Sequence, residues 1–191
     1  YSSLGLPAEL LPADKSMDSI FYLQRPENMD SSKIKGAEIA FSRDFDFLSA
    51  PFNILGIVAN YTYADGEAMY RDIYGVEGNN QTKPFTGLSK NSYNFTLYYE
   101  VDSWGARVSA AYRSPYIAGA SSSGDQDESG FHSTKYIDFS AFYQLTDSVK
   151  LSLEGINLTD EREEFYSDSH DRAYNTTTSG RTYMLGLTAE F

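Results

Sequence analysis

Apolar and polar residues alternate along much of this chain, and no other feature constrains its fold as strongly. In the final segment, Arg181–Phe191, the odd positions are mostly apolar or aromatic and the even positions are mostly small or polar. Successive side chains of a β-strand point to opposite faces of the sheet. The period of two therefore predicts a strand whose two faces lie in different environments.

The same alternation recurs upstream of this segment, so we predict seven strands in all. The other six are residues 36–42, 55–63, 92–101, 104–113, 137–145 and 149–153. After the last of these, the phase of the alternation slips at Glu154–Ile156, which predicts a β-bulge at Gly155.

The chain divides into a lead-in and a strand-bearing region. Residues 1–32 carry Pro7 and Pro12, and we expect them to be irregular, with one possible strand at Met17–Gln24. Residues 33–191 hold the predicted strands. Because the sequence does not begin with Met, we expect a processed product or a piece of a larger protein.

Composition excludes several classes of protein. The chain has 15 Lys and Arg against 27 Asp and Glu, a formal charge of -12, so we expect no nucleic acid as a partner. Cysteine is absent, which excludes a disulfide scaffold, a cysteine-ligated metal and a thiol nucleophile. No run of 18 apolar residues is present, so no membrane-spanning helix is expected.

The predicted connections alternate between short and long, and successive antiparallel strands place successive connections at opposite ends. All long, polar connections should therefore lie at one end, as in transmembrane β-barrels of outer membranes. The short connections are residues 44–51, 102–103 and 146–148, and the long ones are residues 64–89, 116–134 and 160–179. Tyr and Phe recur near the strand ends, where such barrels carry aromatic girdles facing the outer-membrane lipid. A soluble β-sandwich with one buried face per sheet is the alternative reading of the same strands.

Several short motifs in order, together with the final amphipathic strand, resemble TonB-dependent outer-membrane receptors of Gram-negative bacteria. Near the C-terminus, Asn157–Glu161 follows a strand, and Gly180–Gly186 leads to the terminal Phe191. The upstream pieces that agree are Lys35–Glu38, Asn60–Tyr63, Asn91–Asn94, Leu97–Glu100 and Tyr112–Tyr116. The resemblance spans roughly residues 33–191.

The resemblance implies an all-β fold, an antiparallel transmembrane β-barrel of about 22 strands with an N-terminal plug inside it. This chain would supply about the last eight strands, without the plug domain. The intact protein would import a scarce small nutrient (a siderophore, cobalamin or an oligosaccharide), with energy from the TonB complex. The terminal strand resembles the signal read by the barrel assembly machinery, carried by Tyr183, Leu185, Leu187 and Phe191.

Loop aromatics are the best candidates for ligand contact, because flat rings beside Asn and Asp can stack on sugars or iron chelates. These candidates are Tyr70, Tyr74, Phe85, Tyr116, Phe131, His132, Tyr166 and Tyr174. The same rings serve equally well to pack the loops on one another. Arg107, Arg113 and Asp138 are expected to face the lumen, where the arginines either guide anionic ligands or pair with carboxylates.

Enzymatic residues are not expected. The paired carboxylates Asp44/Asp46 and Glu163/Glu164 lie in predicted turns and loops, where acidic groups stay solvated. Asp125–Glu128 and Asp168–Asp171 are incomplete as metal sites, so we predict no metal and no cofactor. The alternatives to a receptor segment are an autonomous eight-stranded structural or adhesion barrel, and a soluble carbohydrate-binding β-sandwich.

Overall fold

Antiparallel strands make up nearly all of the regular structure in the computed structural model, which describes residues 5, 7–21, 32–70, 81–119, 128–167 and 172–190. The strands are β1 (Ser32–Asp44), β2 (Leu55–Tyr70), β3 (Gln81–Pro84), β4 (Asn91–Val101), β5 (Trp104–Arg113), β6 (Tyr116–Gly119), β7 (Ser129–Phe131), β8 (Thr134–Thr146), β9 (Val149–Ile156), β10 (Arg162–Ser167), β11 (Arg172–Thr178) and β12 (Thr182–Ala189). Two single-turn 3₁₀ helices, η2 (Ala8–Leu10) and η3 (Phe52–Ile54), accompany them. The predicted all-β class is confirmed.

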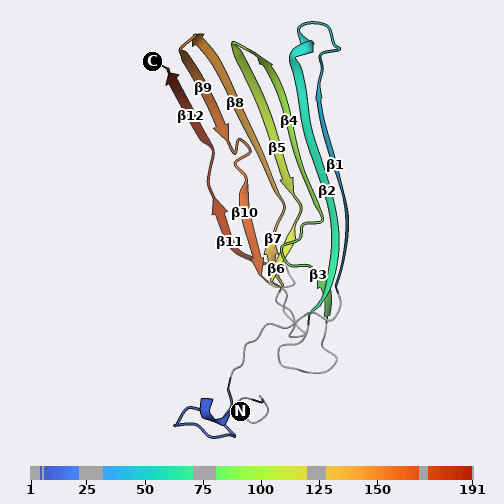
Figure 1. Cartoon of the computed structure of the whole chain (residues 1–191), viewed down its shortest axis with the longest axis vertical. Coiled ribbons are helices and arrows are strands. Elements are labelled where there is room, and N and C mark those ends of the chain that lie inside the picture. Colours follow the sequence, from blue (N-terminus) through green and yellow to red (C-terminus); the bar gives the residue numbers. More distant parts are fainter. Residues whose placement is uncertain are drawn as a thin grey trace.

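The first sheet follows the order of the chain. Its seven long strands pair antiparallel in the order β1-β2-β4-β5-β8-β9-β12, and β3 pairs with the end of β2. Figure 1 shows the short connections at one end of this sheet, near the C-terminus, and all the long ones at the other end. We call these the turn end and the loop end. The seven predicted strands and the asymmetry of their connections are thus confirmed.

The described parts of the long connections contain five short strands that the alternation did not predict. One of them, β3, pairs with β2, and the other four form a second sheet in the order β11-β10-β7-β6. Figure 1 places it at the loop end, beyond β5, β8 and β9, so that it continues the wall and does not cover the face of the first sheet. A soluble sandwich needs a second layer over one face, and this sheet does not supply it.

Pairing register carries apolar residues from strand to strand on one face of the first sheet, which we call the outer face. Leu97 of β4 stands opposite Val108 of β5, which in turn stands opposite Phe139 of β8. These side chains remain accessible, with Leu97 39% and Val108 44% exposed. Only Ala68, Ile117 and Tyr166 are buried apolar residues in the described part of the chain. A sheet with no covered apolar core and a continuous exposed apolar band is suited to face hydrocarbon.

Two rows of aromatic rings border this apolar band. Toward the loop end, Tyr93 stands between Tyr61 and Tyr112, and its ring stacks on that of Tyr112 with centroids 4.9 Å apart. Toward the turn end, the rings of Tyr99 and Trp104 lie 4.9 Å apart, and Tyr143 is the cross-strand partner of Trp104.

The spacing of the two rows fits a bilayer. Trp104 and Tyr112 lie eight residues apart in β5, which at about 3.4 Å per residue and a tilt of about 40° separates them by roughly 20 Å in height. Outer-membrane barrels carry an apolar band about 25 Å tall between such girdles.

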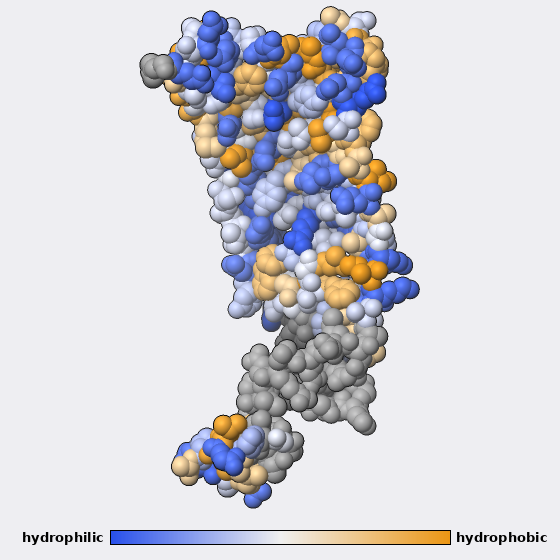
Figure 2. All heavy atoms as spheres, in the orientation of Figure 1, coloured by the Kyte–Doolittle hydropathy of each residue, from blue (hydrophilic) through white to orange (hydrophobic). Residues whose placement is uncertain are grey.

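The opposite, inner face is polar and hydrogen-bonded. Thr96 and Ser109 bond across β4 and β5 at 2.9 Å, and the Asn94 amide donates to Asn60 Oδ1 at 3.1 Å. Figure 2 shows hydrophilic residues running down the middle of the visible side, with hydrophobic residues mainly toward its ends and margins. Large inner-face rings lie over glycines: a Cβ at Gly56 would lie 2.1 Å from Cζ of Tyr98, whose hydroxyl donates to Asp44.

The predicted bulge at Gly155 is wrong. β9 pairs with β12 without interruption from Val149 to Ile156, and the irregularity in its pairing with β8 falls between Gln144 and Thr146. A Cβ at Gly155 would lie 2.9 Å from Cδ2 of Leu158. Leu158 therefore fills the place that Gly155 leaves empty, which accounts for the break in the sequence alternation without a bulge.

Residues 7–21 add no strand to the first sheet, which stays open among the described residues. Residues 17–21 contain no strand, and residues 22–24 of the possible eighth strand lie outside the described residues. Within the described part, no helix has the length and apolar content needed to cross a bilayer. β1 pairs only with β2, and β12 only with β9, so the sheet does not close on itself among the described residues.

The face assignment predicts opposite results for two neighbouring residues. Val108→Arg places a charge in the middle of the outer apolar band, and we expect it to cost about 2–4 kcal/mol of folding free energy in a membrane. Ser109→Arg points to the polar inner face and should cost about 1 kcal/mol or less. The measurement is the denaturant midpoint of each membrane-embedded variant. Equal losses for the two variants would contradict the assignment.

Candidate functional site

The second sheet brings aromatic residues from four separated segments into one row. Tyr116, Phe131 and Phe165 are successive cross-strand partners on β6, β7 and β10. Their ring centroids lie 5.2 Å and 4.9 Å apart, and Tyr174 of β11 continues the series 5.7 Å from Phe165. We call Tyr116, Phe131, Phe165 and Tyr174 the aromatic row. Three of its members are half-buried and Tyr174 is 74% exposed.

The aromatic row lies on the inner side of the wall. The guanidinium carbon of Arg113 lies 3.7 Å from the Tyr116 ring centroid. Arg113 lies on the inner face of β5, the same face as Arg107 and Ser109. The hydroxyl of Tyr136, also on the inner face, donates to Glu163 at 3.4 Å. Because residues two apart in a strand share a side, Phe165 lies on the same side as Glu163.

Arg113 holds the base of this row in place. Its Nε donates to Ser89 Oγ at 2.6 Å and a terminal nitrogen donates to the Gly87 carbonyl at 2.6 Å. The Gly87 N–H in turn donates to the Ile117 carbonyl at 2.7 Å. Arg113 therefore fixes the connection before β4 against β6, and its expected lumen-side position carries a structural role.

The other two lumen-side candidates are also engaged by neighbours. Arg107 donates to Glu100 at 3.2 Å, in an open hollow of about 310 Å³ at the turn end that Lys150 and Glu154 also line. Asp138 accepts the N–H of Asn157 at 2.8 Å. Of the two roles considered for the arginines, Arg107 therefore pairs with a carboxylate.

His132 and Tyr166 lie on the opposite side of the second sheet from the aromatic row. Each directly follows a member of the row, and their rings lie 5.1 Å apart. Tyr166 is buried, and a Cβ at Gly130 would lie 2.5 Å from its hydroxyl oxygen. Glycine at position 130 therefore lets this ring close over β7, which makes Tyr166 a packing residue.

The remaining loop candidates lie apart from the row. Tyr70 donates to the Pro84 carbonyl at 3.1 Å and accepts the Thr86 N–H at 3.1 Å, so it closes the β2–β3 hairpin. Phe85 lies over Gly66, where a Cβ would be 2.7 Å from the ring. Tyr74 lies outside the described residues.

The geometry of an outer-membrane wall with an aromatic site at its loop end agrees with the comparison to known families. The family model of the TonB dependent receptor-like β-barrel matches residues 7–158. The chain belongs to this family. Comparison with curated proteins and with solved structures returns no match.

Membership gives this chain a receptor-like transport role in the outer membrane of Gram-negative bacteria, with TonB and a ligand as the partners that the family implies. The family is one of receptor and transport barrels and not of enzymes. The family model covers a different range from the resemblance seen in the sequence, which spans roughly residues 33–191. The match begins in the lead-in, at residue 7, and stops at residue 158.

A buried asparagine joins the receptor wall to the hairpin that carries half of the aromatic row. Asn157 is 2% exposed and has φ 54°, a left-handed conformation that Asn tolerates better than most residues. Its Oδ1 accepts the Glu161 N–H at 2.7 Å, and its Nδ2 donates to the carbonyls of Glu161 and Gly180 at 3.1 Å and 3.2 Å. The motif Asn157–Glu161 contributed to the family resemblance, but the sequence alone gave no sign of this bonding.

Among the described residues β12 pairs only with β9, so its other edge has no partner strand there. Its side chains Tyr183, Leu185 and Leu187 are 66%, 73% and 68% exposed. Phe191 lies outside the described residues, and the assembly signal remains a prediction.

Metal binding was not expected, and most residues of the two weak candidate metal sites are not among those that the structure describes. Asp125–Asp127 and Asp168–Asp171 lie outside the described residues, whereas Glu128 pairs with Lys83 at 2.9 Å. Among the residues that are described, no three His, Asp or Glu side chains stand together as a metal site.

The Asn157 contacts predict a local effect. Asn157→Ala leaves the Glu161 N–H and the Gly180 carbonyl without their partner, so local opening should become easier by about 1–3 kcal/mol. We expect faster amide hydrogen exchange in β10. Asn175→Ala, at an exposed position in β11, is the matched control and should leave β10 unchanged. Identical exchange in the two variants would show that Asn157 does not hold the hairpin.

Proposed function

We propose that this chain forms the C-terminal part of a barrel that imports a scarce nutrient, and that the aromatic row is part of its binding face. The nutrient is a siderophore, cobalamin or an oligosaccharide, and the energy comes through TonB in the intact protein. The observation that carries the proposal is the aromatic row itself, four rings gathered on the inner side of the loop end.

A row of this kind suits recognition of a ligand with flat or ring-shaped surfaces. Ring centroids separated by 4.5–7 Å are in the range of favourable aromatic packing, so the row is ordered before a ligand arrives. Preorganisation lowers the entropy cost of binding. Tyr174, the most exposed member, offers both a ring face and a hydroxyl to a ligand above the wall.

The free edges support a segment of a larger barrel over an autonomous small one. β1 and β12 each have a single partner strand among the described residues, and β1 is exposed along its whole length. Unpaired edges of this length invite pairing with further strands. We infer that strands preceding β1 complete the wall, and that the assembly machinery reads the amphipathic β12.

Transport is tested with the intact receptor in its own outer membrane. Cells expressing it are given labelled ferric siderophore, cobalamin or oligosaccharide, and uptake is compared with and without an uncoupler of the inner-membrane potential. We expect energy-dependent uptake of one of the three classes. Uptake that is the same in cells lacking the receptor, for all three, would overturn the transport proposal.

The aromatic row predicts a loss of affinity in one variant. Phe131 contacts two neighbouring rings, so Phe131→Ala should raise the Kd of the transported ligand about tenfold. Phe47→Ala removes an exposed ring at the turn end and should leave the Kd unchanged. The measurement is ligand titration of the purified, folded receptor. An unaltered Kd in the Phe131 variant would exclude the row from the binding face.

A further inference from the structure

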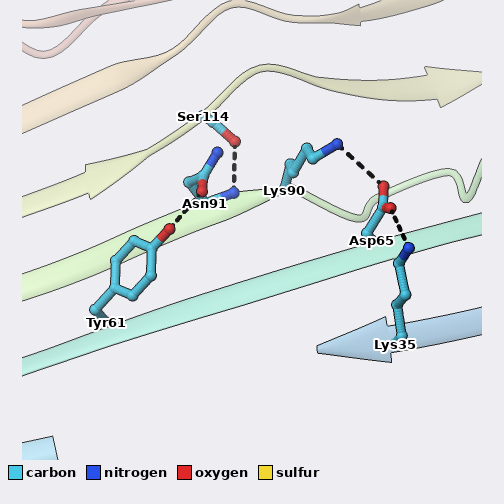
Figure 3. Close-up of polar contacts among 6 residues, drawn as sticks. All are labelled: Lys35, Tyr61, Asp65, Lys90, Asn91 and Ser114. Atoms are coloured by element: carbon cyan, nitrogen blue, oxygen red, sulfur yellow. Dashed lines mark hydrogen bonds and ion pairs between the residues drawn. The ribbon is translucent and has the colours of Figure 1, made fainter. Parts of the chain in front are cut away.

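Two lysines share one aspartate on the outer face of the wall, at its loop end. Lys35 Nζ lies 3.5 Å from Oδ2 of Asp65, and Lys90 Nζ lies 3.3 Å from Oδ1 of the same carboxylate. Figure 3 shows the two ammonium groups approaching Asp65 from β1 and from the start of β4. Lys90 also lies 5.7 Å from the ring centroid of Tyr63.

Pairing register places this cluster on the side that faces lipid. Lys35 is the cross-strand partner of Asp65. Alternation along β1 puts Lys35 on the outer face, the same face as Ile39 and Phe41 of the apolar band. Lys33 lies one step further from the band, opposite Glu67. We call Lys33, Lys35 and Lys90 the lysine patch.

The lysine patch stands just beyond the aromatic border of the band. Tyr61 marks that border on β2, and its hydroxyl donates to Asn91 Oδ1 at 2.6 Å beside Lys90, as Figure 3 shows. Lys35 and Lys90 therefore lie at the level where lipid headgroups meet the wall. Long side chains such as lysine reach this level with the ammonium group outward while the stem covers apolar surface.

Charge at this place is opposite to that of the chain as a whole. The chain carries a formal charge of -12, whereas here three lysines lie beside the two acidic residues Asp65 and Glu67. The hydrogen bond and charge of Asp65 raise the pKa of Lys90, which lies before β4, and so favour its charged form. Lys35 and Lys90 remain 66% and 56% exposed, and each ammonium has three donors, of which Asp65 occupies only part.

We propose that the lysine patch binds the phosphate group of a membrane lipid in the bilayer leaflet at the loop end of the barrel. The carboxylate of Asp65 lies between the two ammonium groups, whose remaining donors are available to a second anion. An exposed ion pair contributes little to stability on its own, so folding alone gives weak reason for this arrangement. A phosphate at headgroup level complements both its charge and its position.

This inference rests on the membrane placement of the proposed function, and the experiment separates the two. The intact receptor, purified in detergent, is titrated with phosphatidic acid or with phosphatidylcholine, and bound lipids are counted by native mass spectrometry. We expect phosphatidic acid to bind the wild type more tightly. Lys35→Gln and Lys90→Gln should each weaken it about fivefold, whereas Lys150→Gln, which removes the same charge on the inner face at the turn end, should have no effect.

Asp65→Asn distinguishes a lipid site from a mere ion pair. It removes the carboxylate that competes with a phosphate, so we expect tighter binding of phosphatidic acid in this variant. Lys35→Arg, which keeps the charge, should retain most of the affinity. Equal binding of phosphatidic acid by the wild type and the lysine variants would overturn the inference.

Two further outcomes are equally decisive. If inorganic phosphate competes fully with phosphatidic acid at equal concentration, the site is an anion site without a lipid, and the inference fails. If the receptor is absent from membrane fractions of the expressing cells, the proposed function fails first. A receptor that inserts and transports but binds both lipids equally would disprove the lysine patch alone.

Discussion

The pairing register of the first sheet is the constraint on which both of its faces depend. Because side chains alternate with a period of two, a slip of one residue between β4 and β5 would move Val108 to the polar side and Ser109 to the lipid side. Large inner-face rings seated over glycines oppose slips of the same kind in the two neighbouring pairs, β2 with β4 and β5 with β8. Tyr98 covers Gly56 and Phe142 covers Gly105, and in each case a Cβ on the glycine would collide with the ring. Register is therefore fixed by side-chain shape as well as by backbone hydrogen bonds.

Local alternation was enough to predict the wall and too little to predict the site. Each long strand has eight or more residues, and the alternation over all or part of it is enough to assign its two faces from the sequence. The strands of the second sheet have three to seven residues, and the pairing of β7 with β10 joins segments that β8 and β9 separate in the chain. Tyr116, Phe131 and Tyr174 could be named as candidates, but Phe165 was missed and nothing indicated that the rings form one row. The adjacent pairs Phe131-His132 and Phe165-Tyr166 could have suggested short strands in the loops with a ring on each side, because neighbouring side chains in a strand point to opposite sides.

The error at Gly155 has a related cause. Reading a strand from its alternation assumes that each outward place is filled by the residue at that position. At Gly155 the space is filled instead by Leu158, which comes from the turn that follows the strand. That turn is shaped by Asn157, whose left-handed backbone and buried side-chain bonds return the chain toward the wall. Tertiary contacts of this kind produce no repeating pattern in the sequence and so could not be predicted from it, although they determine where the loop strands lie.

The inner and outer surfaces at the loop end are joined through one short segment of backbone. Ser89 is held by Arg113, whose guanidinium also lies over Tyr116 at the base of the aromatic row. The next residue, Lys90, pairs with Asp65 on the outer face. Asn91 follows, and its N–H donates to Ser114 Oγ at 2.9 Å. Three consecutive residues are thus bound to the inner side, to the outer side and to the end of β5. The base of the aromatic row and Lys90 of the lysine patch are therefore held by the same short stretch of backbone.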